Sequence, residues 1–429
     1  MLSDEIRAQI RNIIKEEVLP AVGCTEPIAV ALAVSKAVEL LGKIPERIVV
    51  RLSGNIIKNA MGVGIPGTGM IGLPIAIALG VVAGKSSYGL EVLKDVDDEA
   101  VACARQYVDE GRIVIEHLED VPSNLYIMAI VSDNERNEAT AIIAYRHDNF
   151  IMLKKNGTTV WENDCNNDKE AQNSNSVPLS LRIVWDYATL SPLEELEFII
   201  EAKTLNVNAA KVALNNNGAG HKVGKIILNN SSDMFGDSHL SYMLAMTSGA
   251  CDARMAGEQV TVMSNSGSGN QGIAITMPVV AYCERVNASY EKEIRALILA
   301  HLTSIYIKQS LGRLSALCGC VVASTGAALA IVYLMDGSYE QGTYSVKNMI
   351  ATLTGMICDG AKPACSLKIA SGVSTAYIAS LMALNNQCVS STEGIINESV
   401  DETIRNFSLI GREAMLETDR VVLDIMTKS

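Results

Sequence analysis

Three cysteines in the last third of the chain have the side-chain type and the spacing for metal chemistry. Cys318 lies in Leu-Cys-Gly-Cys-Val. Cys358 and Cys365 are the first and last residues of the segment Cys-Asp-Gly-Ala-Lys-Pro-Ala-Cys. Thiolates gathered among apolar and small residues are the usual ligands of iron–sulfur clusters. Three such thiolates would leave one iron of a four-iron cluster free to meet a substrate.

Other interpretations of these thiols stay open. Cys320 fits the position of the third ligand as well as Cys318 does. Zinc favours closely spaced Cys or His pairs, whereas the last third of the chain holds a single histidine, His301. Ordinary buried thiols are the remaining interpretation, because cysteine is among the most buried residue types.

Cys24 stands just before the first turn of a predicted helix. Gly-Cys-Thr-Glu-Pro (Gly23–Pro27) precedes the apolar run Ile28–Leu41, and a proline suits the start of a helix. The positive end of the helix dipole would lower the pKa of this thiol and favour the thiolate that a base or nucleophile requires. A small core residue at a helix entry is the alternative.

Two polar loops could hold the carboxylate of a small substrate. Ser53-Gly-Asn and Ser264–Gly272 offer backbone N–H groups and small polar side chains, which form anion-binding cradles. Arg254 follows Asp252 between apolar segments, so it either clasps a substrate carboxylate or forms a buried ion pair. The predicted substrate-binding residues are Ser53, Gly54, Asn55, Lys58, Asn59, Arg254, Asn265, Ser266, Ser268 and Asn270.

Two other cofactors compete with the cluster as interpretations of the chain. Lys58 could form a Schiff base with pyridoxal phosphate, but the Ser-Phe-Lys context of the pyridoxal dehydratases is missing. Gly-x-Gly-x-x-Gly occurs from Gly62 and from Gly267. The second match comes after a predicted strand, Gln259–Ser264, but Pro278 interrupts the segment after the motif, and the next long element is a helix. These features disfavour a dinucleotide fold.

Composition narrows the class of protein. The 429 residues carry a formal net charge of −13 and no basic run, which argues against nucleic acid or an anionic membrane as a partner. Ten irregularly spaced cysteines without a signal peptide predict a reducing cytoplasm. The apolar stretches Met70–Gly84 and Val321–Met335 fall short of the roughly 18–20 residues that a membrane span needs. Scarce charge with abundant Met and Ala favours a homodimer.

The pattern of elements predicts an α+β protein, in which a mostly helical catalytic core carries an inserted, smaller and β-rich α+β domain. We assign residues 1–94 and 190–429 to the core and residues 95–189 to the insert. The predicted elements are a helix capped by Ser3 and ending at Pro20, strands at Arg47–Leu52, Ile113–His117, Leu125–Ser132, Glu138–Arg146 and Phe150–Leu153, and helices at Tyr290–Gln309 and Asp401–Met426. Ser53–Gly69 is expected to form a loop, and Asn156–Val177 a polar surface loop.

These segments, taken together and in order, resemble the cysteine desulfidase family, whose uncharacterised members are related to the α-chain of iron–sulfur L-serine dehydratases. The matching segments are Gly23–Pro27, Ser53–Asn59, Asp252–Gly257, Ser264–Gly272, Leu314–Cys320 and Cys358–Cys365. The resemblance implies a [4Fe-4S] cluster on three cysteines, for which we choose Cys318, Cys358 and Cys365, and it implies Cys24 as the proton acceptor.

The expected activity is the α,β-elimination of L-cysteine to hydrogen sulfide, pyruvate and ammonia. An open iron would act as a Lewis acid on the leaving group, and a base would remove the Cα proton. L-Serine on the same chemistry is the first alternative, because the sequence does not decide between the two substrates. A cluster-bearing redox or iron sensor is the non-enzymatic alternative.

Overall fold

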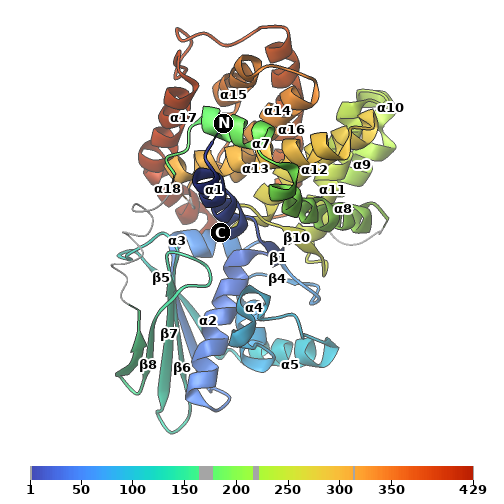
Figure 1. The fold of residues 1–429 in the computed structure, drawn as a ribbon. Helices are drawn as coiled ribbons and strands as arrows, with labels where there is room; N and C mark the ends of the chain where they lie inside the picture. Colours follow the sequence, from blue (N-terminus) through green and yellow to red (C-terminus); the bar gives the residue numbers. More distant parts are fainter. Residues whose placement is uncertain (1, 164–176, 216–221, 313–314, 429) are drawn as a thin grey trace.

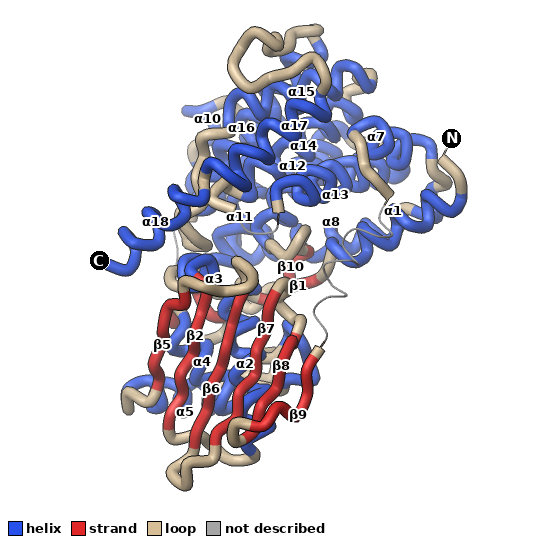
Figure 2. Tube along the Cα trace, turned by 90° about the vertical axis from the view of Figure 1, so that its left-hand side faces the viewer, coloured by secondary structure: helices blue, strands red, loops and turns tan. Residues whose placement is uncertain are grey.

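The computed structural model describes residues 2–163, 177–215, 222–312 and 315–428. It confirms the predicted fold class, because a helical unit lies against a unit built on a mixed sheet (Figure 1). Each unit has its own large hydrophobic core, one within the helical bundle and one between the sheet and its covering helices. Figure 2 shows the sheet below and the helices above, with α3 and the pair β1–β10 at the junction.

The sheet has six strands in the order β5-β2-β6-β7-β8-β9. β2 pairs in parallel with β5 and antiparallel with β6, and the remaining pairs are antiparallel. The strands are β2 (Arg47–Ser53), β5 (Ile113–Leu118), β6 (Tyr126–Ser132), β7 (Glu138–Ala144), β8 (Phe150–Lys155) and β9 (Thr158–Glu162). Alternating apolar residues in β2 and β6 point to one face, and helices cover that face. These helices are α2 (Thr25–Leu41), α4 (Leu73–Val82) and α5 (Asp98–Asp109).

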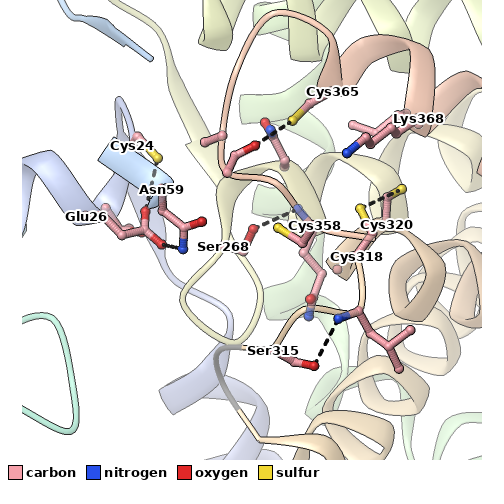
Figure 3. Close-up of a pocket in the computed structure, with 18 of the residues that line it drawn as sticks. Cys24, Glu26, Asn59, Ser268, Ser315, Cys318, Cys320, Cys358, Cys365 and Lys368 are labelled. Carbon is pink, nitrogen blue, oxygen red and sulfur yellow. Dashed lines mark hydrogen bonds between the residues drawn. The ribbon is translucent and has the colours of Figure 1, made fainter. Parts of the chain in front are cut away.

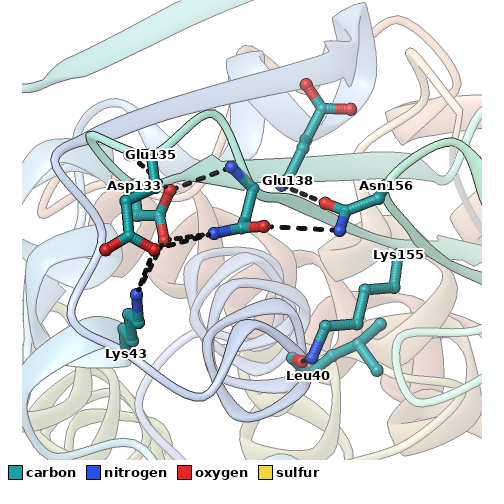
Figure 4. Close-up of polar contacts among 8 residues, drawn as sticks. Leu40, Lys43, Asp133, Glu135, Glu138, Lys155 and Asn156 are labelled. Atoms are coloured by element: carbon teal, nitrogen blue, oxygen red, sulfur yellow. Dashed lines mark hydrogen bonds and ion pairs between the residues drawn. The ribbon is translucent and has the colours of Figure 1, made fainter.

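Polar contacts tie the far rim of the sheet to the end of α2 (Figure 4). Lys43, just after α2, forms ion pairs with Asp133 and Glu135 in the turn between β6 and β7. Lys155 at the end of β8 donates to the carbonyl oxygen of Leu40 at 2.9 Å. Because exposed ion pairs contribute little free energy, these contacts position the turn more than they stabilise the fold.

The helical unit surrounds α14, whose apolar and small residues are almost all buried. α11, α12 and α13 pack around it together with α15 and α16, while α1 lies along the side of the bundle. The bounds of the helices are α1 (Asp4–Glu17), α7 (Leu181–Leu190), α8 (Ile200–Asn215), α9 (Val223–Asn229), α10 (Ser231–Met234), α11 (His239–Met255), α12 (Gly269–Val286), α13 (Tyr290–Leu311), α14 (Gly319–Leu334), α15 (Tyr339–Leu353), α16 (Cys365–Leu384), α17 (Val400–Leu409) and α18 (Leu416–Lys428).

The predicted division at residues 94/95 and 189/190 stays a prediction. In the structure, β2 and the helices α2 and α4, all before residue 95, share the core of the sheet unit. The chain therefore enters the sheet unit soon after residue 24 and leaves it after β9. Two short antiparallel pairs lie near the junction, β1 (Pro20–Val22) with β10 (Thr261–Met263), and β3 (Gly64–Ile65) with β4 (Met70–Ile71).

Three local predictions were wrong. The expected loop after β2 contains a helix, α3 (Gly54–Ala60), whose buried Ile56, Ile57 and Ala60 were obscured by the surrounding glycines. The polar segment after Asn156 begins with a strand, β9, while residues 164–176 lie outside the described part. The predicted C-terminal helix is divided by a π-turn at Ile410–Ala414 into α17 and α18.

Both apolar stretches that we expected to be core helices are buried, as α4 and α14. Among the described helices, α16 is long and apolar enough by composition to cross a membrane. It packs against α11, α14 and α15, and its first residue faces a cavity between the two units, so we interpret α16 as a helix of the folded core.

A buried ion pair joins the two units. Lys58 on α3 is 2% exposed and pairs with Asp419 on α18, which is 15% exposed. Removing one partner leaves the other charge buried and unpaired. Asp419→Asn should therefore lower the free energy of unfolding by roughly 3 kcal/mol. Chemical denaturation would measure this loss, and Lys58→Met combined with Asp419→Leu should recover most of it. Glu116→Gln, in an exposed pair with Arg51, is the control and should change stability by less than about 0.5 kcal/mol.

Candidate functional site

A cavity of about 770 Å³, counting the part that opens to solvent, lies where the two units meet. The first turn of α2 and the helix α3 form one wall, and the loops before α14 and α16 form the other (Figure 3). Its lining residues are Cys24, Thr25, Glu26, Asn59, Arg254, Ser268, Asn270, Gln271, Lys308, Ser315, Leu317, Cys318, Gly319, Cys320, Cys358, Gly360, Ala361, Cys365, Lys368 and Ile369. Cysteines distant in sequence therefore meet in one place.

Backbone hydrogen bonds connect the loop before α14, which contains Cys318, with the loop before α16, which contains Cys358. The N–H of Cys318 donates to the carbonyl oxygen of Met356 at 3.0 Å, and the N–H of Cys358 donates to that of Ala316 at 2.6 Å. These bonds flank an antiparallel bridge between Leu317 and Ile357. The peptide backbone alone thus places Cys318 and Cys358 diagonally across this bridge.

Gly360 brings the third cysteine to the same wall. Its φ of +92° is a left-handed conformation that favours glycine, and a Cβ there would lie 2.1 Å from the carbonyl oxygen of Lys58. The loop can therefore press against α3 before it enters α16. Cys365, the first residue of α16, places its sulfur 3.7 Å from the carbonyl oxygen of Gly360.

The cysteine thiols differ in how readily they ionise. The sulfurs of Cys318 and Cys320 lie 3.5 Å apart, and this hydrogen bond lowers the pKa of Cys318 to about 7 and raises that of Cys320. Burial raises the pKa of Cys358 to about 11 and also raises the pKa of Cys365. Cys318 is thus the thiol most readily converted to a thiolate ligand.

The donor set has the chemistry of an iron–sulfur site, with three thiols on one wall of the cavity. Among the described residues, no group of three or more His, Cys, Asp or Glu side chains could hold one ion. In a cubane each thiolate binds a different iron, so its sulfurs stand further apart than ligands of one ion. Cys318, Cys358 and Cys365 share a wall, and Lys368, which forms an ion pair with Asp359, lies beside them.

Cys24 lies across the cavity from the other cysteines (Figure 3). It is the N-cap of α2, as expected, but the prediction of a lowered pKa was wrong. The side chain is only 3% exposed, so burial raises the pKa of Cys24 well above its ordinary value, and the charge of Glu26 raises it further. Desolvation outweighs the helix dipole, and the thiol stays protonated in the free protein.

Glu26 is a site residue that the sequence interpretation did not select. Its Oε2 accepts from the Cys24 thiol at 3.1 Å, and its Oε1 accepts from Asn59 Nδ2 at 3.1 Å. His147 Nε2 lies 3.8 Å from Oε1. Burial would raise the pKa of Glu26, but the interactions with His147 and Cys24 outweigh it and lower this pKa to about 2.

Arg254 holds the cavity wall in place. Its Nε and Nη2 donate to the carbonyl oxygen of Gly23 at 3.1 and 2.9 Å, and its Nη1 donates to Asn270 Oδ1 at 2.9 Å. This fixes the peptide just before Cys24. Ser268, the N-cap of α12, and Asn270 both line the cavity, as does Asn59.

Six predicted substrate-binding residues do not line the cavity: Ser53, Gly54, Asn55, Lys58, Asn265 and Ser266. Ser53 caps the sheet by accepting from the N–H of Tyr126, and Asn265 is buried against His301. The ion pair of Lys58 with Asp419 turns its amine to α18, which removes support for a pyridoxal Schiff base.

The glycine motif at the start of α12 serves packing. A Cβ on Gly272 would lie 1.9 Å from the carbonyl oxygen of Met263, so only glycine lets α12 approach β10 this closely. β10 pairs antiparallel with β1 in a two-stranded sheet, unlike the parallel strands of a dinucleotide fold. The expected interruption at Pro278 was wrong, because α12 continues through it with buried residues on both sides.

Further cavity residues were missed because their signal is weak in sequence. Lys308 and Lys368 lie on otherwise apolar stretches of α13 and α16, where a lone lysine resembles a solvent-exposed position. Gln271 lay inside the predicted Ser264–Gly272 loop without being selected. Glu26 was the detectable one, as a charged residue in an otherwise apolar helix start.

Comparison with known proteins finds one matching family profile and relatives that align with nearly the whole chain. A family profile described as "Serine dehydratase alpha chain" matches residues 87–424. A UPF0597 protein of Phocaeicola vulgatus is 55% identical over 434 residues, covering 100% of this chain and 99% of the relative. Those of Porphyromonas gingivalis and Aeromonas hydrophila subsp. hydrophila are 48% and 41% identical, covering 98% and 97% of this chain and 98% and 95% of the relatives.

Proposed function

Since this chain belongs to the serine dehydratase α-chain family, we propose that it is an iron–sulfur lyase that converts L-cysteine to hydrogen sulfide, pyruvate and ammonia. One observation carries the proposal. Cys318, Cys358 and Cys365 line one wall of a cavity whose opposite wall bears Cys24, the expected proton acceptor (Figure 3). Elimination needs such an arrangement, with the leaving group on one side of the substrate and a base on the other.

The three cysteines on the first wall would hold a [4Fe-4S] cluster. When bound, such a cluster supplies a Lewis-acidic iron without a protein ligand, which polarises the bond to the leaving group. Backbone hydrogen bonds position the main chain of Cys318 and Cys358, and the start of α16 positions that of Cys365. Of the two neighbouring thiols, Cys318 is favoured because its pKa is the lower.

On the opposite wall, Cys24 would accept the Cα proton of the substrate. Arg254 anchors the Gly23–Cys24 peptide, which keeps the sulfur directed to the cavity. Because the thiol is protonated in the free protein, it must lose its proton before it can act as a base. The free enzyme should therefore gain kcat/KM as the pH rises through the alkaline range.

The charges of the cavity suit an amino acid. Lys308, Lys368 and Arg254 line it with positive charge, of which the charge of Lys368 is paired with Asp359. Ser268 and Asn270 add small polar groups beside Arg254. A substrate carboxylate held among them would fix which face of the Cα–H bond meets Cys24. A thiol leaving group matches soft iron–sulfur chemistry, which favours L-cysteine over L-serine.

An oxygen-free assay tests the proposed activity. Protein purified without oxygen should release pyruvate and sulfide from L-cysteine, more efficiently by kcat/KM than pyruvate from L-serine. Higher kcat/KM with L-serine would replace the proposed substrate and keep the reaction class. Iron-loaded protein that releases no pyruvate from either amino acid would refute the lyase and favour a redox or iron sensor. A cytoplasmic location and a homodimeric assembly remain part of the proposal.

A further inference from the structure

A buried chain of polar groups runs from Cys24 to the sheet unit. Cys24 Sγ donates to Glu26 Oε2, and His147 Nε2 lies 3.8 Å from Glu26 Oε1. Cys24 and Glu26 lie at the start of α2, whereas His147 belongs to the turn between β7 and β8. All three residues are less than a tenth exposed.

The contacts of Glu26 direct it toward Cys24. Asn59 Nδ2 donates to Oε1 at 3.1 Å, and the hydroxyl of Thr25 lies 3.1 Å from Oε2. Both carboxylate oxygens thus have protein donors, which fix the side chain beside the thiol. Among the described residues that line the cavity, Glu26 bears the one carboxylate.

Among the described residues, few charged or titratable groups face these three side chains. Glu26 and Arg254 face Cys24, and Cys24 and His147 face Glu26. Lys58 on the neighbouring α3 is directed away, to Asp419. A buried carboxylate that accepts a hydrogen bond from a thiol can take up the thiol proton, and an imidazole beside its other oxygen can hold the carboxylate in place.

We propose that Glu26 and His147 are positioning residues for Cys24, in which Glu26 accepts the thiol proton and His147 holds Glu26, so that the turn between β7 and β8 takes part in the reaction. This inference rests on the proposed function. In the step, the S–H bond of Cys24 breaks and an O–H bond forms on Glu26 Oε2, which leaves a thiolate and a carboxylic acid beside His147. The thiolate then takes the Cα proton and becomes a thiol again, and the Glu26 carboxylic acid releases its proton to the cavity, where it protonates the departing hydrosulfide to hydrogen sulfide.

Two measurements on Glu26→Gln test the proposal together. The kcat for L-cysteine should fall by roughly 100-fold with little change in KM, because the amide cannot take up the thiol proton in the substrate complex. In the same iron-loaded variant, iodoacetamide should alkylate Cys24 at pH 8 faster than in the wild type. The reason is that the charge of Glu26, which raises the pKa of Cys24, is absent. Peptide mass spectrometry would quantify the labelled Cys24, and iron analysis would confirm the cluster.

Second variants keep the test independent of misfolding. His147→Gln keeps a polar group at the same place and should lower kcat by about 10-fold or more, while Glu26→Asp should restore part of the Glu26→Gln loss. Glu116→Gln on the exposed side of β5 is the matched control and should match wild type in both assays.

The outcomes separate the two proposals. Unchanged kcat in both Glu26→Gln and His147→Gln, or a loss of kcat without faster alkylation of Cys24 in Glu26→Gln, would overturn the positioning role. Because the alkylation assay needs no turnover, it still reads the Cys24–Glu26 pair if the protein turns out not to be a lyase.

Discussion

Replacing Cys365 by alanine is expected to yield a colourless protein without lyase activity. Cys365 begins α16 and shares the cavity wall with Cys318 and Cys358, so its loss leaves only two of the proposed thiolates. Cys358→Ala should behave in the same way. Iron and acid-labile sulfide analysis after oxygen-free purification, together with pyruvate release from L-cysteine, would measure both effects.

The neighbouring thiols give a matched pair for this experiment. Cys318→Ser should lose iron and activity, whereas Cys320→Ser should keep most of both, because the hydrogen bond between them favours ionisation of Cys318. Cys103→Ser, on the exposed side of α5, is the control for a cysteine far from the cavity. A brown and active Cys365→Ala variant would refute the ligand assignment, and the reverse order for Cys318 and Cys320 would exchange the third ligand.

Replacing Cys24 by alanine should separate catalysis from cluster binding. The variant is expected to keep its iron, because Cys24 lies on the opposite wall, and to lose roughly 10²- to 10⁴-fold in kcat, the range for a missing general base. Steady-state kinetics and iron analysis on the same preparation would show this. Cys283→Ala, which removes another buried thiol outside the cavity, controls for loss of packing.

Loss of iron in Cys24→Ala would instead make Cys24 a ligand and move the base elsewhere. In the wild type, kcat/KM should rise with pH across the alkaline range, because the pKa of Cys24 is raised in the free enzyme and the thiolate becomes more abundant as pH increases. A kcat/KM profile that is flat from neutral to alkaline pH would contradict this role.

The fold class could be predicted from periodicity, since apolar alternation marks β2 and β5–β8 and helical spacing marks α1 and α13. The boundary between the two cores could not be predicted in the same way. Whether α2 packs on the sheet or the bundle depends on tertiary contacts, because its residues are apolar on all sides. The helix α3 was not predicted either, because seven residues that begin with a glycine are too few to show a helical period.

The cysteines of the cavity could be selected from residue type and spacing alone, although their role is a proposal. The protonation state of Cys24 could not be predicted. The sequence shows the start of the helix, whose dipole lowers the pKa, but not the burial, which raises the pKa more. His147 was out of reach for a similar reason. It is distant from Glu26 in sequence, and only the turn between β7 and β8 brings the two together.

The bridge between Leu317 and Ile357 bears on how the holoprotein would mature. It is made by main-chain atoms, so the fold of the chain itself positions the loops proposed to hold the cluster. In small zinc modules, by contrast, the ion itself drives the chain to fold. We therefore expect the metal-free polypeptide to accumulate as a native, loadable scaffold, on which iron delivery is a late and separable event.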